Sequence, residues 1–264
     1  SYYKTTARPT FREASSAYLI DPVTETFFLG NPDIKSSYID NIDLRYEIFG
    51  NNSEMFAFSL FSKNFKDPIE ISVVSDDTPN DFIAINNEKA TVRGIEFEIR
   101  KNLFVIDNLT FNANSNASFI SAKQTMSDIE YDSRVILAEP GQVISREREL
   151  QGQSPYMINA GLVVNESEKE LEVGVFYNVQ GPTLEFVGFG GIPDIYSEPF
   201  HNLDFSASKV FNGEKISKKI TLKANNILQE KRESYYVWND EKSGLFRSFS
   251  PGILFSLGVS ITFN

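Results

Sequence analysis

The residues that could carry nucleophilic or acid–base chemistry lie within one short segment, at His201, Asp204 and Ser206. A hydrolase triad depends on the geometry of its three groups and not on their nearness in sequence. If the segment is a strand, His201 and Asp204 point to opposite sides, while Asp204 and Ser206 share one. We therefore expect no catalytic residues. The glycine-rich stretch 188–191 has no following Lys-Ser or Lys-Thr pair, so it does not predict a phosphate-binding loop.

Metal and cofactor chemistry has few suitable side chains in this sequence. There is no cysteine and a single histidine, which excludes thiolate sites and multi-histidine sites. The acidic segment 76–81 offers hard oxygen ligands of the kind that bind Ca²⁺. It lacks the spacing of a known calcium loop, so a solvated acidic loop is the simpler interpretation. We expect no metal site and no cofactor.

Polar residues at a spacing of two form a second group of candidates. Asn112, Asn114 and Asn116 could bind a sugar-like solute through their amides, and charged residues at the same spacing could line a solute path or contact another domain. A hydrated, polar sheet face explains both sets without any ligand. The charged candidates are Arg45, Glu47, Glu96, Glu98 and Arg100.

Period-two alternation of apolar and polar residues is the dominant pattern, and it is typical of strands with two different faces. In residues 42–48 the even positions are apolar and the odd positions are charged, and in residues 253–263 the odd positions are apolar. The pattern predicts ten strands of ten or more residues. They lie near 1–13, 36–49, 55–73, 83–103, 108–126, 150–165, 170–187, 198–212, 217–238 and 245–263.

The same alternation predicts which side chains share a face. The polar candidates named above should point inward, toward a lumen. The apolar set should point outward, toward lipid: Tyr46, Ile48, Ile95, Phe97, Ile99, Phe111, Val173, Val175, Leu222, Phe255 and Leu257.

The lengths of strands and links favour a membrane barrel. Strands of soluble sheets have about 5–6 residues, whereas a tilted strand needs about 9–11 to cross the apolar part of a membrane. Outer-membrane barrels alternate short periplasmic turns with long extracellular loops. We therefore predict an all-β fold of antiparallel transmembrane barrel strands in one domain, with Phe263 and Asn264 in the periplasm. The short turns lie at 50–54, 105–108, 165–170 and 212–217, and the long links at 14–35, 74–82, 127–149, 188–199 and 239–244.

Composition agrees with this interpretation. The formal charge of −11 argues against nucleic acid as a partner, and the aromatic content of 13% fits strands that end at a membrane interface. No apolar run approaches the roughly 18 residues of a membrane helix.

Aromatic residues in the long links could stack on a ligand, although an interfacial girdle explains many of them. These weak ligand candidates are Tyr18, Tyr131, Phe186, Phe189 and Tyr196.

Several segments resemble the C-terminal barrel half of TonB-dependent outer-membrane receptors. Residues 30–35 (GNPDIK) with 41–47 (NIDLRYE), and residues 150–161 (LQGQSPYMINAG), are similar to recurrent patterns of that family. The matching segments follow the family's order and span nearly the whole chain. One difference is that the family usually ends on an aromatic residue, whereas Asn264 follows Phe263 here. The shorter matches lie at 6–9, 11–13, 65–70, 94–98 and 224–228.

The resemblance implies a barrel of about 22 strands with a plugged lumen. It also implies ligand-gated import of a scarce solute, such as an iron chelate, cobalamin or an oligosaccharide, across a Gram-negative outer membrane. The implied partners are outer-membrane lipid, an N-terminal plug domain, the remaining barrel strands, the TonB energy-coupling complex and an extracellular small solute. Because ten strands are too few, we expect residues 1–264 to be the C-terminal portion of such a barrel, without the plug and upstream strands. The alternative is a non-transport barrel, an adhesin or a structural protein.

Overall fold

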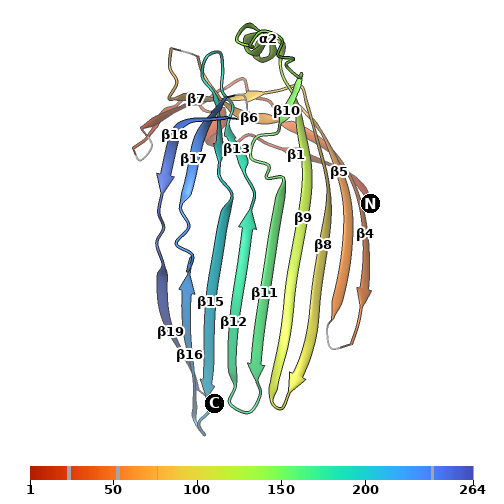
Figure 1. The fold of residues 1–264 in the computed structure, drawn as a ribbon, viewed down its shortest axis with the longest axis vertical. Helices are drawn as coiled ribbons and strands as arrows, with labels where there is room; N and C mark the ends of the chain where they lie inside the picture. The colour runs from red at the N-terminus through yellow and green to blue at the C-terminus, as the bar shows by residue number, and fades with distance from the viewer. Residues whose placement is uncertain (23–24, 52–53, 76, 239–240, 264) are drawn as a thin grey trace.

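The computed structural model of the protein describes residues 1–22, 25–51, 54–75, 77–238 and 241–263. One long antiparallel sheet dominates its fold (Figure 1). Ten strands follow one another through this sheet in chain order. This confirms the predicted fold class. The strands are β1 (Tyr2–Ala7), β4 (Ser37–Phe49), β5 (Met55–Lys66), β8 (Lys89–Ile106), β9 (Leu109–Thr125), β11 (Tyr156–Glu166), β12 (Leu171–Gln180), β15 (Phe200–Phe211), β16 (Ile216–Asn225) and β19 (Leu254–Phe263). A short strand, β10 (Glu147–Glu149), pairs with β9 beside this path.

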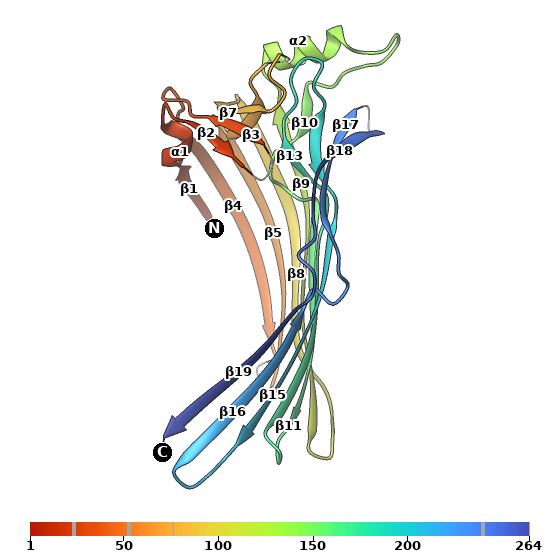
Figure 2. The same ribbon diagram turned by 90° about the vertical axis from the view of Figure 1, so that its left-hand side faces the viewer.

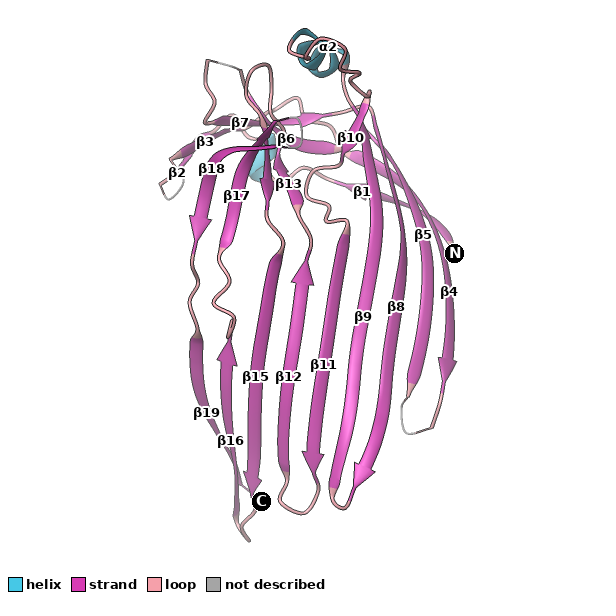
Figure 3. Ribbon diagram, in the orientation of Figure 1, coloured by secondary structure: helices cyan, strands magenta, loops and turns pink. Residues whose placement is uncertain are grey.

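The two ends of the long sheet differ in their connections. At one end, which we call the turn end, β4–β5, β8–β9, β11–β12 and β15–β16 are joined by short hairpin turns (Figure 1). At the other, the loop end, the connections are long and contain further strands and both helices (Figure 3). The predicted turn 50–54, the acidic segment 76–81 and the predicted links 14–35 and 239–244 each include residues outside the described ranges. The terminal Asn264 also lies outside them.

The strand register gathers apolar side chains on one side of the long sheet. Phe58 lies opposite Tyr46 and Phe97, and Leu222 lies opposite Leu257 at the other edge. Direct cross-strand partners project to the same side. Leu257 is 67% exposed, and a continuous exposed apolar surface marks a contact with a membrane or another protein. We call this side the apolar face and the other the polar face.

All the residues predicted to point outward lie on the apolar face. The pairings connect them from β4 through β8, β9 and β12 to β16 and β19. The sheet is curved, so that β1 and the C-terminal end of β19 both lie on the left of the central strands in Figure 2. Curvature of this kind accompanies the twist of antiparallel strands.

Several predicted strands proved too long. Asp67 has a φ of 54° and precedes Pro68, and Asn226 also has a φ of 54°, a backbone conformation outside the β region. Pro182 and Pro251 lack the amide that a ladder needs. The predicted strands 55–73, 170–187, 217–238 and 245–263 are therefore each two strands in the structure. The predicted strand 83–103 is also two strands, with its break at Asn87 and Glu88.

Two small sheets occupy the loop end (Figures 1 and 2). Each has four strands, in the orders β2-β3-β7-β6 and β13-β14-β17-β18. Phe82 of the first sheet and Phe186 of the second have ring centroids 4.3 Å apart within the main buried apolar cluster. The strands are β2 (Tyr18–Asp21), β3 (Thr26–Leu29), β6 (Ile69–Val73), β7 (Asp81–Asn86), β13 (Thr183–Phe186), β14 (Asp194–Ser197), β17 (Arg232–Trp238) and β18 (Glu241–Phe249).

The two helices begin at side-chain caps. The predicted strand 1–13 stops at Ala7, because Thr10 and Glu13 form a capping box that starts helix α1 (Phe11–Ala14). The predicted strand 150–165 also begins later than expected, at β11. Helix α2 (Asp128–Ile136) starts at Ser127, whose hydroxyl accepts from the Glu130 amide at 3.2 Å. Neither helix, nor any other in the described residues, is long and apolar enough to cross a membrane.

Candidate functional site: the polar face and the loop-end cavity

The polar face holds all the predicted lumen candidates. Glu98 lies opposite Asn116, and Ser59 lies opposite both Arg45 and Glu96. Because direct partners share a face, one register places the whole set together. The set is Arg45, Glu47, Glu96, Glu98, Arg100, Asn112, Asn114 and Asn116.

Glu98 is the centre of a charged group on this face. Its Oε2 accepts from Arg45 Nη2 at 3.0 Å, and its Oε1 accepts from Arg100 Nη2 at 2.8 Å. Arg45 Nε also donates to Glu47 at 2.6 Å. The Arg45 and Glu98 side chains remain 42% and 23% exposed. Such a solvated ion cluster is typical of a hydrated barrel interior.

A row of asparagines crosses four strands of the polar face. Asn116, Asn159, Asn178 and Asn202 lie directly opposite one another on β9, β11, β12 and β15. Asn159 Nδ2 donates to Asn116 Oδ1 at 2.7 Å, and Asn178 Nδ2 donates to Asn159 Oδ1 at 2.5 Å. A cavity of about 300 Å³ lies along the row. The sequence pattern identified only Asn116, because placing the other three requires the register between strands.

The residues considered as a triad do not come together. His201 lies opposite Val179 on the apolar face, where its Nδ1 is 2.6 Å from the Tyr177 hydroxyl. Asp204 and Ser206 lie on the polar face, and Asp204 accepts from the Asn226 amide at 2.9 Å. The alternation within β15 thus separates the imidazole from both oxygen groups.

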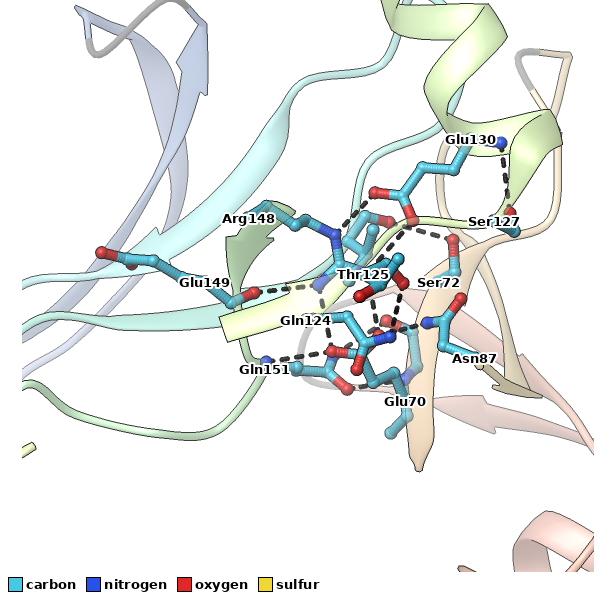
Figure 4. Close-up of polar contacts among 12 residues, drawn as sticks. Glu70, Ser72, Asn87, Gln124, Thr125, Ser127, Glu130, Arg148, Glu149 and Gln151 are labelled. Atoms are coloured by element: carbon cyan, nitrogen blue, oxygen red, sulfur yellow. Dashed lines mark hydrogen bonds and ion pairs between the residues drawn. The ribbon is translucent and has the colours of Figure 1, made fainter. Parts of the chain in front are cut away.

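A buried ion network lies at the loop end, where β6, β10 and α2 meet (Figure 4). Arg148 donates from Nη1 and Nη2 to Glu70 at 3.0 and 2.8 Å, and from Nε to Glu130 at 2.6 Å. Burial alone would lower the pKa of Arg148, but hydrogen bonds to Glu70 and Glu130 and their charges outweigh it and raise that pKa. Arg148 therefore stays charged and connects three elements.

Gln151, labelled in Figure 4, lies beside this network and connects it to β13. Its Oε1 accepts from the Ile71 amide at 2.6 Å, and its Nε2 donates to the carbonyls of Ile71 and Glu185 at 2.8 and 2.7 Å. Its own amide donates to Glu70 at 3.1 Å. Gln151 belongs to the LQGQSPY segment, so the structure gives that segment a local role in joining β6 to β13.

Arg134 of α2 carries the network on to β14. Its Nη1 and Nη2 donate to Asp194 at 3.0 and 2.8 Å, and Nη2 also donates to Glu130 at 3.1 Å. Asp194 accepts a further hydrogen bond from the Gly188 amide at 2.8 Å. A β-carbon at Gly188 would lie 2.2 Å from a backbone oxygen, so only glycine fits there. These contacts fix the turn that carries Phe189.

A cavity of about 250 Å³ opens beside this network. Phe189, Tyr196 and Trp238 provide aromatic surface, and Arg134 and Asp194 provide charge. Burial, with the Asp194 charge adding to it, raises the pKa of Tyr196, so its hydroxyl stays protonated. Ligand sites typically combine apolar lining with a few placed polar groups. This cavity is therefore the best candidate for recognition of a small solute.

The other three predicted loop aromatics lie outside the cavity lining. Phe186 packs in the buried cluster, Tyr18 stacks on Phe27 with centroids 5.0 Å apart, and Tyr131 lies under Arg146 at 4.2 Å. The sequence analysis did not identify Trp238 as a ligand candidate, because its place in the cavity lining depends on the packing of β17 beside β14. In the described part of the chain, no group of three or more acidic or histidine side chains is placed to hold a metal ion.

The long antiparallel strands have one apolar and one polar face, with short turns at one end and long loops at the other. These features are those of the wall of a transmembrane β-barrel. Residues 1–227 match the family described as TonB dependent receptor-like, beta-barrel. The chain belongs to this family.

Solved structures with the same fold include two receptors and one transporter. A mutant ferric enterobactin receptor from Pseudomonas aeruginosa has 13% identity and a TM-score of 0.56, over 99% of this chain and 37% of that one. The siderophore receptor PirA from the same organism has 15% identity and a TM-score of 0.55, over 100% of this chain and 38% of that one. The outer membrane transporter YddB from Escherichia coli has 15% identity and a TM-score of 0.56, over 92% of this chain and 35% of that one. The chain thus spans 35–38% of their length. A comparison with curated proteins found no match.

Proposed function

We propose that this chain forms part of the barrel of a TonB-dependent receptor that imports a scarce solute across the outer membrane. The observation that supports it most is the division of the sheet into an apolar face and a polar face within a chain of this family. The apolar face would contact lipid, the polar face would line the lumen, and the loop end would be extracellular. The C-terminus would then be periplasmic.

The edges of the sheet support further partners. β1 and β19 end the order of paired strands in the described residues, and unpaired edges are unfavourable in lipid. We propose that other barrel strands pair with these edges and that the polar face surrounds a plug domain. Energy would reach the solute through that plug and the TonB complex. In this proposal the charged group of Arg45, Glu98 and Arg100 on the polar face would contact the plug or a passing solute.

Recognition would take place in the loop-end cavity. Tyr196 and Trp238 offer aromatic surface for stacking, and the Arg134–Asp194 pair offers charge. Aromatic side chains in well-packed pockets often dominate binding energy, and truncating one costs about 2 kcal/mol or more. The solute would therefore carry a ring or another flat apolar group together with polar groups.

The test is growth of a deletion strain on a panel of iron sources and carbon sources, with the full-length protein restored. Restoration on one source identifies the solute. Tyr196→Ala and Trp238→Ala should then weaken uptake of that solute by roughly tenfold or more, as expected for lost aromatic contacts. Tyr18→Ala is the matched control, because Tyr18 is an exposed loop-end aromatic outside the cavity lining.

Two outcomes would contradict the proposal. Growth of the deletion strain at wild-type rates on every source would favour a non-transport barrel, such as an adhesin. Equal losses in Tyr18→Ala and Tyr196→Ala would show that the cavity is not where recognition takes place.

A further inference from the structure

The apolar face carries a cluster of basic side chains at the loop ends of β5, β8 and β9. Lys66 lies directly opposite Lys89, and Arg93 lies four residues further along β8 on the same face. Like charges directly opposite one another destabilise a sheet. In the described part of the chain, the ion pairs present involve none of these three cations. This cluster of positive charge stands out because the protein as a whole has a formal charge of −11.

The nearest carboxylates in sequence, Asp67 and Glu88, form no ion pair with Lys66 or Lys89 within the described residues. Lys123 of β9 lies opposite Thr91, between Lys89 and Arg93, and adds a fourth cation on the same face. Glu149 of β10 lies opposite Lys123 and offsets part of its charge. Asp40 of β4 lies two positions from the partner of Lys66, but it is engaged by the Tyr2 hydroxyl at 2.7 Å and by Lys4. The cluster of Lys66, Lys89 and Arg93 thus keeps its positive charge.

Directly toward the turn end, the apolar face has a shallow, open groove. The groove has a volume of about 640 Å³ and an apolar floor formed by Ile42, Leu44, Leu60, Ile95 and Phe119. Its polar border is a row of three residues, in which Arg93 lies between the hydroxyls of Ser62 and Ser121 on the neighbouring strands. The surface therefore presents an apolar groove that ends at hydroxyl donors and three cations.

We propose that this surface binds a phosphorylated lipid of the outer leaflet. Its acyl chain would lie in the groove, and its phosphate would accept hydrogen bonds from Arg93 and the two serines, with Lys66 and Lys89 above. Arginine forms bidentate contacts with phosphate oxygens, and each basic residue near an anionic membrane surface strengthens binding by about fivefold. The inference rests on the proposed function, because it requires the apolar face in a membrane and the loop end outside.

The test uses the full-length protein in detergent, titrated with diphosphorylated lipid A or with the same lipid after enzymatic removal of its phosphates. Native mass spectrometry measures the bound fraction. Wild type should prefer the phosphorylated lipid at least tenfold. The triple variant Lys66→Gln, Lys89→Gln, Arg93→Gln should weaken its binding by about a hundredfold, and Arg93→Gln alone by about fivefold. The control removes three cations from the other border of the same face: Lys101→Gln, Lys209→Gln, Lys218→Gln.

Equal affinity of wild type for the two lipids, or unchanged binding in both cluster variants, would overturn the inference. Displacement of the lipid by millimolar inorganic phosphate would assign the cluster to a free anion instead and would also overturn it. Membrane placement is measured separately. If urea extracts the wild-type protein from membranes, the proposed function fails, whereas firm integration with no phosphate preference contradicts only the lipid site.

Discussion

Arg148 and Glu70 are separated by 78 residues in the sequence, yet their side chains form two N–H···O contacts, at 3.0 and 2.8 Å. Paired contacts of this kind fix orientation as well as distance. The side chains are 6% and 1% exposed, so loss of either would leave the other as a buried charge without its main partner. The position of β10 against β6 depends on this pair.

Arg148→Ala should destabilise the loop end by about 3–5 kcal/mol, because it removes the partner of two buried carboxylates. Hydrogen exchange of the full-length protein should show lost protection across 127–151. Arg146→Ala is the control, since its pair with Asp128 is largely exposed and such pairs contribute about 1 kcal/mol or less. Equal protection in the two variants would show that the network does not hold α2 and β10 in place.

Phe97→Arg should destabilise the assembled barrel by about 2–4 kcal/mol if the site is near the middle of the membrane. Phe97 packs against Phe58 on the apolar face, with centroids 5.2 Å apart. Asn116→Arg places the same side chain on the polar face, opposite Glu98, and should be tolerated. Urea unfolding in detergent measures both. The same midpoint for the two variants would count against lipid contact at Phe97.

Alkaline pH should loosen the loop-end cavity through Tyr196. Its pKa is raised in the folded state, so its contribution to stability is complete below the ordinary tyrosine pKa of about 10 and is lost at higher pH. Fluorescence of Trp238, the single tryptophan, should change above that pH in wild type. Tyr196→Phe has no proton to lose and should shift the change to higher pH. An identical profile in the variant would exclude Tyr196 as the titrating group.

Residues 1–264 expressed alone should not form a stable, monodisperse monomer. β1 and β19 would each present an unpaired edge, which favours aggregation or edge-to-edge pairing. Barrel diameter is linked to strand number, so these ten strands cannot close at the curvature of a larger barrel. Size-exclusion chromatography and planar-bilayer recording test this. A heat-modifiable monomer that conducts ions would instead indicate a small self-contained barrel.

The long sheet could be predicted from the sequence because alternation is a local signal. Most of the ten strands carry their own period of two, although β1 does not. The turn-end hairpins were placed correctly at 165–170 and 212–217. The predicted strands were too long where the alternation of apolar and polar residues continued past a residue that ends the strand. Asp67-Pro68 and Gly181-Pro182 were visible in the sequence, yet alternation extended the predicted strands beyond them.

The candidate site could be predicted only in part, because its contacts join distant segments. Phe189 and Tyr196 were expected as loop aromatics, but Trp238 and the Arg134–Asp194 pair were not. Nothing local marks Glu70 as buried, since it sits at an ordinary strand position and its partner follows 78 residues later. Such positions follow from the packing of the two small sheets and not from the period of any strand.

The order of strand pairing also has a consequence for how the protein assembles. Neighbours in the long sheet are successive along the chain, whereas the parallel β3–β7 pair, the β14–β17 pair and the contacts of Arg148 join remote segments. Closing a longer loop costs more entropy, and contacts between nearby residues form sooner. The sheet can therefore grow hairpin by hairpin, while the cavity must wait for every loop that lines it. We therefore expect the cavity region to form last and to open locally without unfolding the sheet beneath it.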